Sequence, residues 1–493
     1  MQGAGETGSS SQTNGTVLAT ARRMRYRALA CDYDGTLAED GSVAPATLDA
    51  LRRLRQSGRR LILVSGRELE DLQKAFGSMD LFDRAVLENG ALLYRPADGS
   101  VTMLADPPPP GLVELLQRRG VSPLSQGHAI LATWEPFEGL VLEAIHDLGL
   151  EMQIIFNKGA VMVLPSGVNK GTGLCHALEE LGLSTHEVAG IGDAENDHAF
   201  LACCECAAVV DNAVPLLKQR ADLVTKGARG SGVVELVERL LADDLAGVQL
   251  PRHDLLLGRD SSGEDVRVPA YGSRVLVAGH REARSRLSRD LMGRLAVQGY
   301  QFCLLDPEGE HGSLAGCVHL GDVGHSPGVD EVLHVLEQPR RSATVDLSGA
   351  NADEQRALFS ELLLALSGLG RKAGRPHWLA LDEAERLVPA EHSLVALDDF
   401  AGVLLATERV DDVSVEVLQA TSTMVAAGDA AVGGLAAFAR IAGHVLPAAR
   451  AQQLRPNEAA VWQRSAEARL KTMMLEPEQR SADVAVPSHP AAR

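Results

Sequence analysis

The chain has 493 residues, 45% of them hydrophobic and 23% charged, which is too long for one ordinary hydrophobic core and predicts two or three domains. Acidic residues outnumber basic ones, and the formal net charge is −19. A field of that sign repels nucleic-acid backbones and anionic lipids. We therefore expect neither nucleic acid nor membrane among the partners.

Aromatic residues make up 3% of the chain and glycine occurs 48 times, a balance that suits layered α/β folds with cores of Ala, Leu and Val. No apolar run of about 18 residues occurs, and residues 1–25 lack the apolar stretch of a signal peptide. The 7 cysteines are scattered, unlike a disulfide framework. We expect a cytoplasmic protein whose residues 1–24, rich in Gly, Ser, Thr and Gln, form a disordered leader.

Short apolar runs alternate with helical patterns between Tyr26 and Leu241. The runs RALAC and RLILV precede polar turns, and helical patterns cover residues 46–56 and begin again at Glu68. Strands buried on both faces and separated by helices predict a parallel sheet. Ligands of such sheets bind at the carboxyl ends of the strands.

The rhythm breaks at residues 91–164, where a hairpin-like pattern, PPPP and two helical stretches predict an inserted α+β subdomain. The expected core therefore covers residues 25–90 and 165–242. A polar stretch at 243–253 predicts a linker to a second α/β domain at 254–450. The remaining tail, 451–493, is expected to hold a helix near 459–474 and then to taper into disorder.

Two carboxylates, Asp32 and Asp34, directly follow the first apolar run, and Gly35 supplies a tight turn after them. A carboxylate pair on a loop suits Mg²⁺, which prefers oxygen ligands, and it suits nucleophilic attack on phosphorus. Taken alone, this pattern also fits an ordinary turn.

Further polar groups follow other predicted strands. They are Ser65, Gly66 and Arg67 after LILV, Asn169 and Lys170 in GVNKG, and Asp193, Asn196 and Asp197 after VAGI. Singly, they fit a helix N-cap, a solvated turn and an acidic helix start. Together they supply a nucleophile, a phosphate clamp, a cation and metal ligands, which makes coincidence the weaker interpretation.

These motifs resemble the haloacid dehalogenase superfamily, in particular its Cof-like branch of phosphatases. DYDGTL, VSGR, the lysine of GVNKG and GDAENDHAF match its four motifs, and ENGA at 88–91 stands where such proteins enter their cap. The resemblance covers roughly residues 26–242. It implies a Rossmann-like α/β core with an inserted α+β cap of the C2 type.

The resemblance also implies roles for individual residues. Asp32 would attack phosphorus and form an aspartyl-phosphate, and Asp34 would protonate the leaving oxygen and then activate water. Ser65 and Lys170 would hold the transferring phosphoryl group. A divalent cation and Lys170 are needed before Asp32 can approach a phosphate dianion.

The implied cofactor is Mg²⁺, held by Asp32, Asp193 and the backbone carbonyl of Asp34. Asp197 would orient a metal-bound water or Lys170, and Asn196 would support the ligands without binding the ion. Candidate substrate contacts are Gly66, Arg67 and Asn169. His128 and His146 are also conceivable contacts, although isolated histidines more often have a structural role.

In the second half, RVLVAG ends at Gly279 where a phosphate-binding loop would begin. The pattern GxxxxGK[ST] would then require glycine, lysine and a hydroxyl residue at the positions of Arg284, Ser285 and Arg286. Asp382 and Glu383 follow another apolar strand, as in a Walker B motif. With LLDPEGEH at 304–311, residues 254–450 resemble a HerA/VirB4-type P-loop ATPase with a degraded phosphate loop.

Such a domain is expected to bind a protein partner, assemble a homo-oligomer or regulate the first half rather than to hydrolyse ATP. Any α/β domain with an acidic strand end is the plainer alternative. For the whole chain we expect a Mg²⁺-dependent phosphatase acting on a small phosphorylated metabolite, a sugar phosphate or a phospho-acid. A phosphotransferase or mutase with the same intermediate, and a nucleotide-sensing or scaffold protein with a regulatory first half, are the alternatives.

Overall fold

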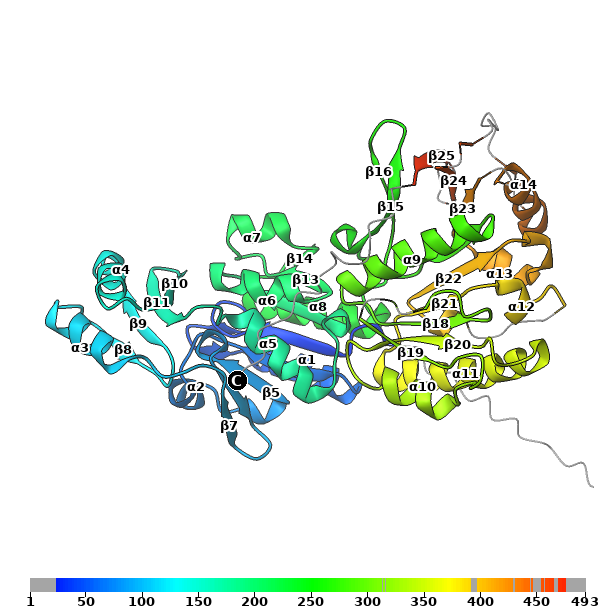
Figure 1. Cartoon of the computed structure of the whole chain (residues 1–493). Coiled ribbons are helices and arrows are strands. Elements are labelled where there is room, and N and C mark those ends of the chain that lie inside the picture. The colour runs from blue at the N-terminus through cyan, green and yellow to red at the C-terminus, as the bar shows by residue number, and fades with distance from the viewer. Residues whose placement is uncertain are drawn as a thin grey trace, which may run out of the picture.

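The computed structural model describes residues 24–312, 314, 316–391, 397–428, 431–443, 445–446, 454–455, 457–464 and 469–475. The leader expected at residues 1–24 lies outside this part of the chain except for Met24. Three units follow one another across Figure 1: a cap at the left, a core in the middle and a C-terminal domain at the right. The cap and the C-terminal domain therefore flank the core on opposite sides.

The core contains an eight-stranded sheet with the strand order β14-β13-β12-β1-β4-β5-β6-β7. The pairings from β14 to β5 are parallel, and those of β6 and β7 are antiparallel. The strands are β1 (Ala28–Asp32), β4 (Arg60–Val64), β5 (Arg84–Leu87), β6 (Leu92–Arg95), β7 (Ser100–Met103), β12 (Val188–Gly192), β13 (Cys206–Val209) and β14 (Leu223–Val224). A small separate hairpin joins β2 (Ala38–Glu39) to β3 (Ser42–Val43).

Helices cover both faces of this sheet because successive side chains of a strand point to opposite sides. In β1, Leu29 and Cys31 pack on the side of the first helix group, and Ala28 and Ala30 pack on the side of the second. The first group is α1 (Pro45–Gln56), α2 (Leu69–Ala75) and α8 (Arg229–Asp243), and the second is α5 (Lys170–Leu181), α6 (His198–Cys203) and α7 (Pro215–Arg220). Burial on both faces explains the uninterrupted apolar runs and confirms the Rossmann-like α/β core.

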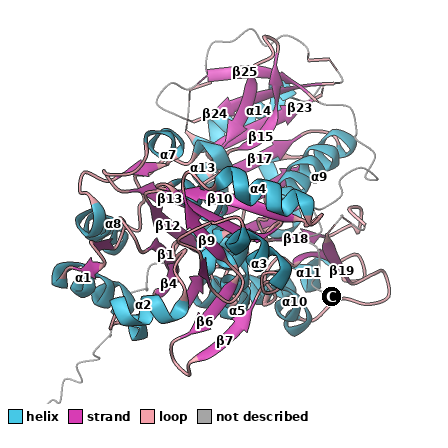
Figure 2. Cartoon of the chain, turned by 90° about the vertical axis from the view of Figure 1, so that its left-hand side faces the viewer, coloured by secondary structure: helices cyan, strands magenta, loops and turns pink. Residues whose placement is uncertain are grey.

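The cap is a four-stranded antiparallel sheet of order β10-β11-β9-β8. Its elements are α3 (Pro110–Arg118), β8 (Ser125–Gln126), β9 (Leu131–Trp134), α4 (Glu138–Asp147), β10 (Met152–Asn157) and β11 (Ala160–Pro165). Leu131, Val161 and Val163 form an apolar cluster with residues of α3 and α4, so the helices cover one face of this sheet. Figure 2, viewed from the cap side, shows both helices in front of the core strands.

The boundary expected for the insertion at residue 91 is wrong, because the hairpin β6–β7 extends the core sheet instead of joining the cap. The turn η2 (Glu88–Gly90) folds β6 back on β5, with Leu92 opposite Leu87. Glu88 and Asn89 adopt positive φ angles of 49° and 53° there. A hairpin-like pattern predicts the strands but not the sheet that they join.

The C-terminal domain contains an 11-stranded sheet with the order β16-β15-β25-β24-β23-β17-β22-β21-β18-β20-β19. Its pairings from β23 to β19 are parallel, and those from β16 to β23 are antiparallel. The strands are β15 (Leu255–Asp260), β16 (Asp265–Val268), β17 (Arg274–Ala278), β18 (Phe302–Asp306), β19 (Cys317–Leu320), β20 (Ser342–Asp346), β21 (Trp378–Leu381), β22 (Gly402–Thr407), β23 (Thr423–Ala427), β24 (Glu458–Gln463) and β25 (Arg469–Met474).

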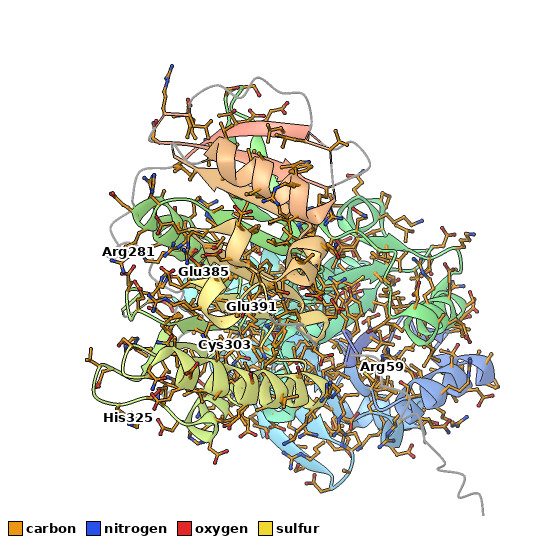
Figure 3. All side chains as sticks on the ribbon, turned by 90° about the vertical axis from the view of Figure 1, so that its right-hand side faces the viewer. Arg59, Arg281, Cys303, His325, Glu385 and Glu391 are labelled. Carbon is orange, nitrogen blue, oxygen red and sulfur yellow. The ribbon has the colours of Figure 1, made fainter. Side chains whose placement is uncertain are left out.

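Helices flank this second sheet as well, and Figure 3 views them from the C-terminal side. They are α9 (Arg281–Val297), α10 (Val329–Leu336), α11 (Ala352–Ala373), α12 (Ala384–Leu387), α13 (Val415–Ala420) and α14 (Ala431–Ala442). The unit is therefore an α/β domain, and its membership of the P-loop class stays a prediction. No helix in the described ranges combines the length and apolar character that crossing a bilayer requires.

The helix expected near residues 459–474 is wrong, because this segment forms β24 and β25. Val461 is buried in one apolar cluster of the domain and Trp462 in another, so successive residues face opposite sides of the sheet. β24 adds antiparallel to β23, with Ala426 opposite Ala460. The sequence of β24, EAAVWQ, is a short apolar run bounded by polar residues, a pattern that fits a buried strand as well as part of a helix.

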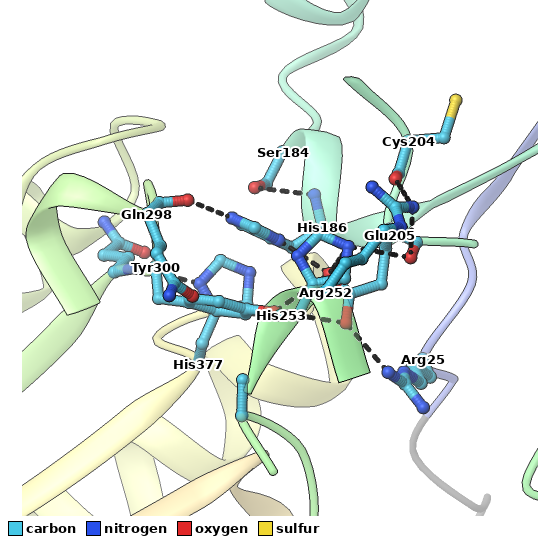
Figure 4. Close-up of polar contacts among 12 residues, drawn as sticks. Arg25, Ser184, His186, Cys204, Glu205, Arg252, His253, Gln298, Tyr300 and His377 are labelled. Atoms are coloured by element: carbon cyan, nitrogen blue, oxygen red, sulfur yellow. Dashed lines mark hydrogen bonds and ion pairs between the residues drawn. The ribbon is translucent and has the colours of Figure 1, made fainter. Parts of the chain in front are cut away.

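The core and the C-terminal domain meet at a buried polar cluster, drawn in Figure 4. The His186 ring stacks on the Tyr300 ring at a centroid distance of 3.7 Å. Its Nδ1 lies 2.7 Å from Glu205 Oε2 and its Nε2 lies 2.8 Å from the carbonyl oxygen of Gln298. The Tyr300 hydroxyl donates to Glu205 Oε2 at 3.0 Å, and Arg25 donates to Glu205 Oε1 at 2.8 Å. Groups from both domains thus compensate one buried carboxylate.

Candidate active site

The predicted site residues follow neighbouring strands of the core sheet. Asp32 is the last residue of β1, Ser65 follows β4 and Asp193 follows β12. The parallel register pairs Asp32 with Val64 and Cys31 with Ile191, so the three strands end at the same edge. This arrangement brings side chains from distant parts of the sequence to one edge of the sheet.

Lys170 stands at the first turn of α5 and links two carboxylates. Its Nζ lies 2.6 Å from Asp32 Oδ1 and 2.7 Å from Asp197 Oδ1, although its side chain is only 2% exposed. The Oδ1 of Asn169 caps the helix by accepting from the backbone N–H groups of Gly171 and Thr172, at 2.9 and 3.1 Å. Asn169, expected to contact substrate, thus commits its amide oxygen to positioning Lys170.

Gly90 permits the close approach of the core turn η2 to the start of α5. Its φ is 103°, and a Cβ at this position would lie 2.0 Å from the carbonyl oxygen of Asn169. Any other residue would push the helix N-terminus, and Lys170 with it, away from the sheet. The ENGA segment therefore matters for the position of Lys170, in addition to folding β6 back on β5.

Asp193 and Asp197 complete the carboxylate cluster. Asp197 Oδ2 accepts from the backbone N–H groups of Asp193 and Ala194 at 2.8 and 2.9 Å, which fixes the loop after β12. One carboxylate oxygen from each of Asp32, Asp193 and Asp197 lies within 4.8 Å of the others. Such a set of oxygen atoms could hold a metal ion.

Burial governs the electrostatics of this cluster. Burial raises the pKa of Asp32 to about 8, with a further increase from the charge of Asp197 and an opposing effect of Lys170. Burial also raises the pKa of Asp193. For Lys170 burial acts to lower the pKa, but the charges of Asp197 and Asp32 outweigh it and raise the pKa above its ordinary value. Additional positive charge would therefore stabilise the ionised carboxylates.

Asp34 points to a different partner. Arg67 donates to both of its carboxylate oxygens, from Nε to Oδ2 and from Nη2 to Oδ1, each at 2.7 Å. Arg67 also donates to Asp71 at 2.8 Å. Bidentate pairs of this kind are strong and directional. Arg67, expected to contact substrate, therefore binds both carboxylate oxygens of the predicted general acid.

Lys158, to which no sequence motif points, reaches the site from the cap. Its Nζ lies 2.7 Å from Asp193 Oδ2 and 3.4 Å from the backbone carbonyl oxygen of Asp34. These are two of the oxygen ligands that the resemblance implies for Mg²⁺. An ammonium group standing at both shows that the donor set accepts a cation. A lysine before glycine in a strand-turn-strand pattern gave no signal that its side chain reaches Asp193.

The other predicted residues surround these groups. Ser65 is buried, and its Oγ accepts from the backbone N–H of Arg67 at 3.2 Å, next to Gly66. Asn196 donates to Asn89 Oδ1 at 2.9 Å, which ties the loop after β12 to the ENGA turn. Its role in supporting the metal ligands stays a prediction.

The two histidines considered as substrate contacts differ in their surroundings. His128 is held by Glu88, whose Oε1 lies 3.0 Å from both the backbone nitrogen and Nδ1 of His128. Glu88 Oε2 also accepts from the backbone N–H groups of Ala129 and Ile130. His146 is exposed on α4. Glu88, a buried carboxylate, thus fastens a cap loop to the core.

The C-terminal domain places Arg284 where the phosphate loop was expected. Its guanidinium, with an exposed fraction of 0%, contacts Asp382 Oδ1 at 3.2 Å and also pairs with Glu383. His311 Nε2 lies 2.8 Å from Asp382 Oδ2. Arg281, labelled in Figure 3, pairs with Glu308 and Glu310 beside this position. Internal cations therefore occupy the predicted Walker B carboxylates.

A second set of metal-ligating side chains lies in the interdomain cluster. Ring nitrogens of His186 and His253 and a carboxylate oxygen of Glu205 lie within 4.8 Å of one another. Arg25 contacts the same carboxylate, and Arg252 donates to the backbone carbonyl of Glu205 at 2.9 Å. Because these charges already compensate Glu205 and oppose a further cation, we interpret the set as a hydrogen-bonded domain contact.

Comparison with known proteins matches residues 29–107 and 141–237 to the model of the haloacid dehalogenase-like hydrolase family. A phosphoglycolate phosphatase of Methanothermobacter thermautotrophicus is 30% identical over 224 residues, which cover 44% of this chain and 99% of that protein. The chain belongs to the haloacid dehalogenase-like hydrolases. The matched residues include the four motifs and most of the predicted core.

Other haloacid dehalogenase-like hydrolases match the same part of the chain. Phosphoglycolate phosphatase 2 of Saccharolobus solfataricus is 29% identical over 221 residues, covering 43% of this chain and 92% of that protein. A solved haloacid dehalogenase-like hydrolase of Bacteroides thetaiotaomicron has 20% identity and a TM-score of 0.39, over 44% of this chain and all of that one. The chain is a phosphoric monoester hydrolase of this family, as its phosphatase relatives indicate.

Proposed function

We propose that this haloacid dehalogenase-like hydrolase releases phosphate from a small phosphorylated carboxylic acid through an aspartyl-phosphate on Asp32. The observation that carries the proposal is the contact of Lys170 with both Asp32 and Asp197 at the end of β1. It supports a nucleophile that is held in place and shielded from water. The names of the relatives favour a phospho-acid over a sugar phosphate.

In the first step, an Asp32 oxygen bonds to phosphorus while the bond from phosphorus to the substrate oxygen breaks. Lys170, next to Asp32, carries positive charge into a region where negative charge accumulates during transfer. Ser65, at the end of the adjacent strand, supplies a hydroxyl for a phosphoryl oxygen. In the second step, water attacks the phosphorus of the aspartyl-phosphate and regenerates the Asp32 carboxylate.

Asp34 serves both steps as the proton carrier. It gives a proton to the departing substrate oxygen and then takes one from the attacking water. In the absence of substrate, Arg67 binds both oxygens of the Asp34 carboxylate. The first role requires that substrate binding frees Asp34 from Arg67, so Arg67 changes partner during the reaction.

The cation site at Asp32, Asp193 and the Asp34 carbonyl fits Mg²⁺, a hard cation with oxygen ligands. When bound there, Mg²⁺ supplies charge that offsets the repulsion between the nucleophilic carboxylate and the phosphate dianion. Thr36 and Asn212 donate to Asp193 at 3.3 and 3.2 Å and orient its carboxylate.

Phosphate release from 2-phosphoglycolate by the full chain, with and without Mg²⁺, tests this function. We expect release that depends on Mg²⁺ and that Asp32→Asn abolishes. Release that persists in Asp32→Asn would refute the assignment of the nucleophile. A product in which the phosphoryl group has moved to another hydroxyl would instead identify a phosphotransferase.

For the C-terminal domain we infer a role other than ATP hydrolysis, because Arg284 and His311 already bind the carboxylates that a nucleotide-bound metal would need. Calorimetric titration of the Mg²⁺-saturated Asp32→Asn full chain with ATP is expected to show no binding of ATP at the C-terminal domain. Binding that Asp382→Asn weakens would contradict the inference.

A further inference from the structure

Lys158 occupies the tip of the cap hairpin formed by β10 and β11. Asn157 pairs with Ala160, and the two residues between them, Lys158 and Gly159, have φ angles of 49° and 86°. Such tight two-residue turns fix the geometry of a hairpin. The backbone of the cap therefore determines how far the ammonium group reaches into the core.

The ammonium group reaches a deeply buried carboxylate from a partly solvated stem. The Lys158 side chain is 48% exposed, whereas Asp193 is 1% exposed. Its contacts are Asp193 Oδ2 at 2.7 Å and the Asp34 carbonyl oxygen at 3.4 Å. The hairpin therefore delivers one positive charge to the catalytic carboxylates from the cap side.

The neighbouring cations are committed more firmly than Lys158. Lys170 is buried between Asp32 and Asp197, and Arg67 holds Asp34 through two bonds. The Lys158 side chain is 48% exposed, so its ammonium group can return to water at a lower cost than that of the buried Lys170. Lys158 is therefore the cation that an incoming charged ligand can recruit.

A divalent cation and the Lys158 ammonium compete for the same two oxygen atoms. When the cation holds Asp193 and the Asp34 carbonyl, Lys158 loses both partners while its hairpin stays at the mouth of the site. An ammonium group next to a phosphate site binds a second anionic group of a substrate well. Phosphate esters of simple alcohols have no second anionic group and would leave the Lys158 ammonium without a partner.

We propose that Lys158 is the specificity-determining residue of the cap, and that it binds the carboxylate of a phosphorylated acid after a divalent cation has displaced it from Asp193. This inference rests on the proposed function. It names the second anionic group as the feature that the cap recognises in a substrate.

The test compares kcat/KM for 2-phosphoglycolate and ethyl phosphate, which differ by the carboxylate, in the full chain with Mg²⁺. Wild type is expected to prefer 2-phosphoglycolate, and Lys158→Met to lower this preference by about 30-fold, mainly through KM. Lys158→Arg keeps the positive charge and should therefore retain part of the preference for 2-phosphoglycolate. Lys74→Met, at an exposed position of α2, is the matched control and should keep the wild-type preference.

A second measurement does not depend on turnover. Without substrate, Lys158→Met is expected to bind Mg²⁺ about fivefold more tightly than wild type, because the competing ammonium is gone. Calorimetry measures the affinity. Trp134 gives an optical signal, since it is 53% exposed beside the Lys158–Gly159 turn, whereas Trp378 and Trp462 are 0% and 2% exposed.

The outcomes separate the two claims. Equal loss of both substrates in Lys158→Met, or unchanged Mg²⁺ affinity, overturns the role of Lys158. If wild type hydrolyses ethyl phosphate and 2-phosphoglycolate with equal efficiency, the role of Lys158 in specificity is also overturned. The proposed phosphatase function would then still stand. Hydrolysis of neither substrate refutes the proposed function, and the inference about Lys158 falls with it.

Discussion

Lys170 donates to Asp32 Oδ1 at 2.6 Å in a region where both side chains are almost fully buried. The same ammonium group holds Asp197 at 2.7 Å, so a single cation separates two carboxylates. Charge pairs of this kind depend on every partner, because removal of one leaves the other buried without compensation. The nucleophile and its cation therefore form one unit.

Lys170→Met tests that unit. We expect kcat/KM for 2-phosphoglycolate to fall by about two to three orders of magnitude, because positive charge is lost next to the transferring group. The thermal midpoint of the variant should also fall. The decrease should be larger at about pH 8 than at about pH 5, since protonation of Asp32 at the lower pH relieves its repulsion with Asp197. A thermal midpoint shift independent of pH would contradict this explanation.

Asp34→Asn separates the two chemical steps. The variant cannot activate water, but an aryl phosphate needs little help with its leaving group. Rapid mixing with p-nitrophenyl phosphate should give a burst of about one equivalent of p-nitrophenol per chain, followed by very slow turnover. Asp32→Asn, its matched control, should give no burst. Steady release without a burst would argue against an acid–base role of Asp34.

Binding of Mg²⁺ should release protons. Burial and the charge of Asp197 raise the pKa of Asp32 to about 8, and Mg²⁺ requires the carboxylate form. The affinity for Mg²⁺ should therefore increase from about pH 6.5 to about pH 9, by up to roughly tenfold per pH unit below that pKa. Calorimetry in two buffers with different ionisation enthalpies counts the protons. Equal affinity at both ends of this range would exclude Asp32 as a ligand.

Glu205 should stabilise the contact between the core and the C-terminal domain. Burial acts to raise its pKa, but the His186 hydrogen bond and the charges of His186, His253 and Arg25 outweigh burial and lower the pKa below its ordinary value. A depressed pKa means stability that is present above the unfolded value of about 4.3 and is lost as the pH falls through the folded value.

Glu205→Gln should consequently lower the thermal midpoint at neutral pH, and the difference from wild type should shrink below about pH 4. Glu238→Gln removes an exposed partner of Arg53 and serves as the matched control, with a midpoint near wild type. A Glu205→Gln midpoint that matches wild type at neutral pH would show that the buried cluster adds no stability.

The sequence predicts the core sheet and the carboxylate cluster because strand periodicity and strand-end motifs are local signals. Asp32, Lys170 and Asp193 each follow or begin an element that its own neighbours specify. Lys158 could not be found in this way, since its role depends on how the cap packs over the core. The same limit explains β6 and β7, whose alternation is local but whose partner sheet is set by the left-handed turn at Glu88 and Asn89.

The interdomain cluster is a second case in which local sequence patterns do not reveal contacts between distant segments. His186, Glu205 and Tyr300 carry no shared motif, and His186 contacts Gln298 from a distant part of the chain. Arg284 shows the same limit, because a loop pattern places it after β17 but does not reveal its buried contact with Asp382. The relation of this domain to P-loop ATPases stays a prediction.

Trapping of the phosphorylated enzyme tests the central claim most directly. The full chain is mixed with 2-phosphoglycolate and Mg²⁺, quenched in acid during turnover and reduced with borohydride, which converts an aspartyl-phosphate to homoserine. Mass spectrometry of the peptides then locates the converted residue. Homoserine at the position of Asp32, absent when substrate is omitted, is the predicted result. Turnover of substrate with unmodified Asp32 under the same quench, or conversion at another aspartate, would contradict it.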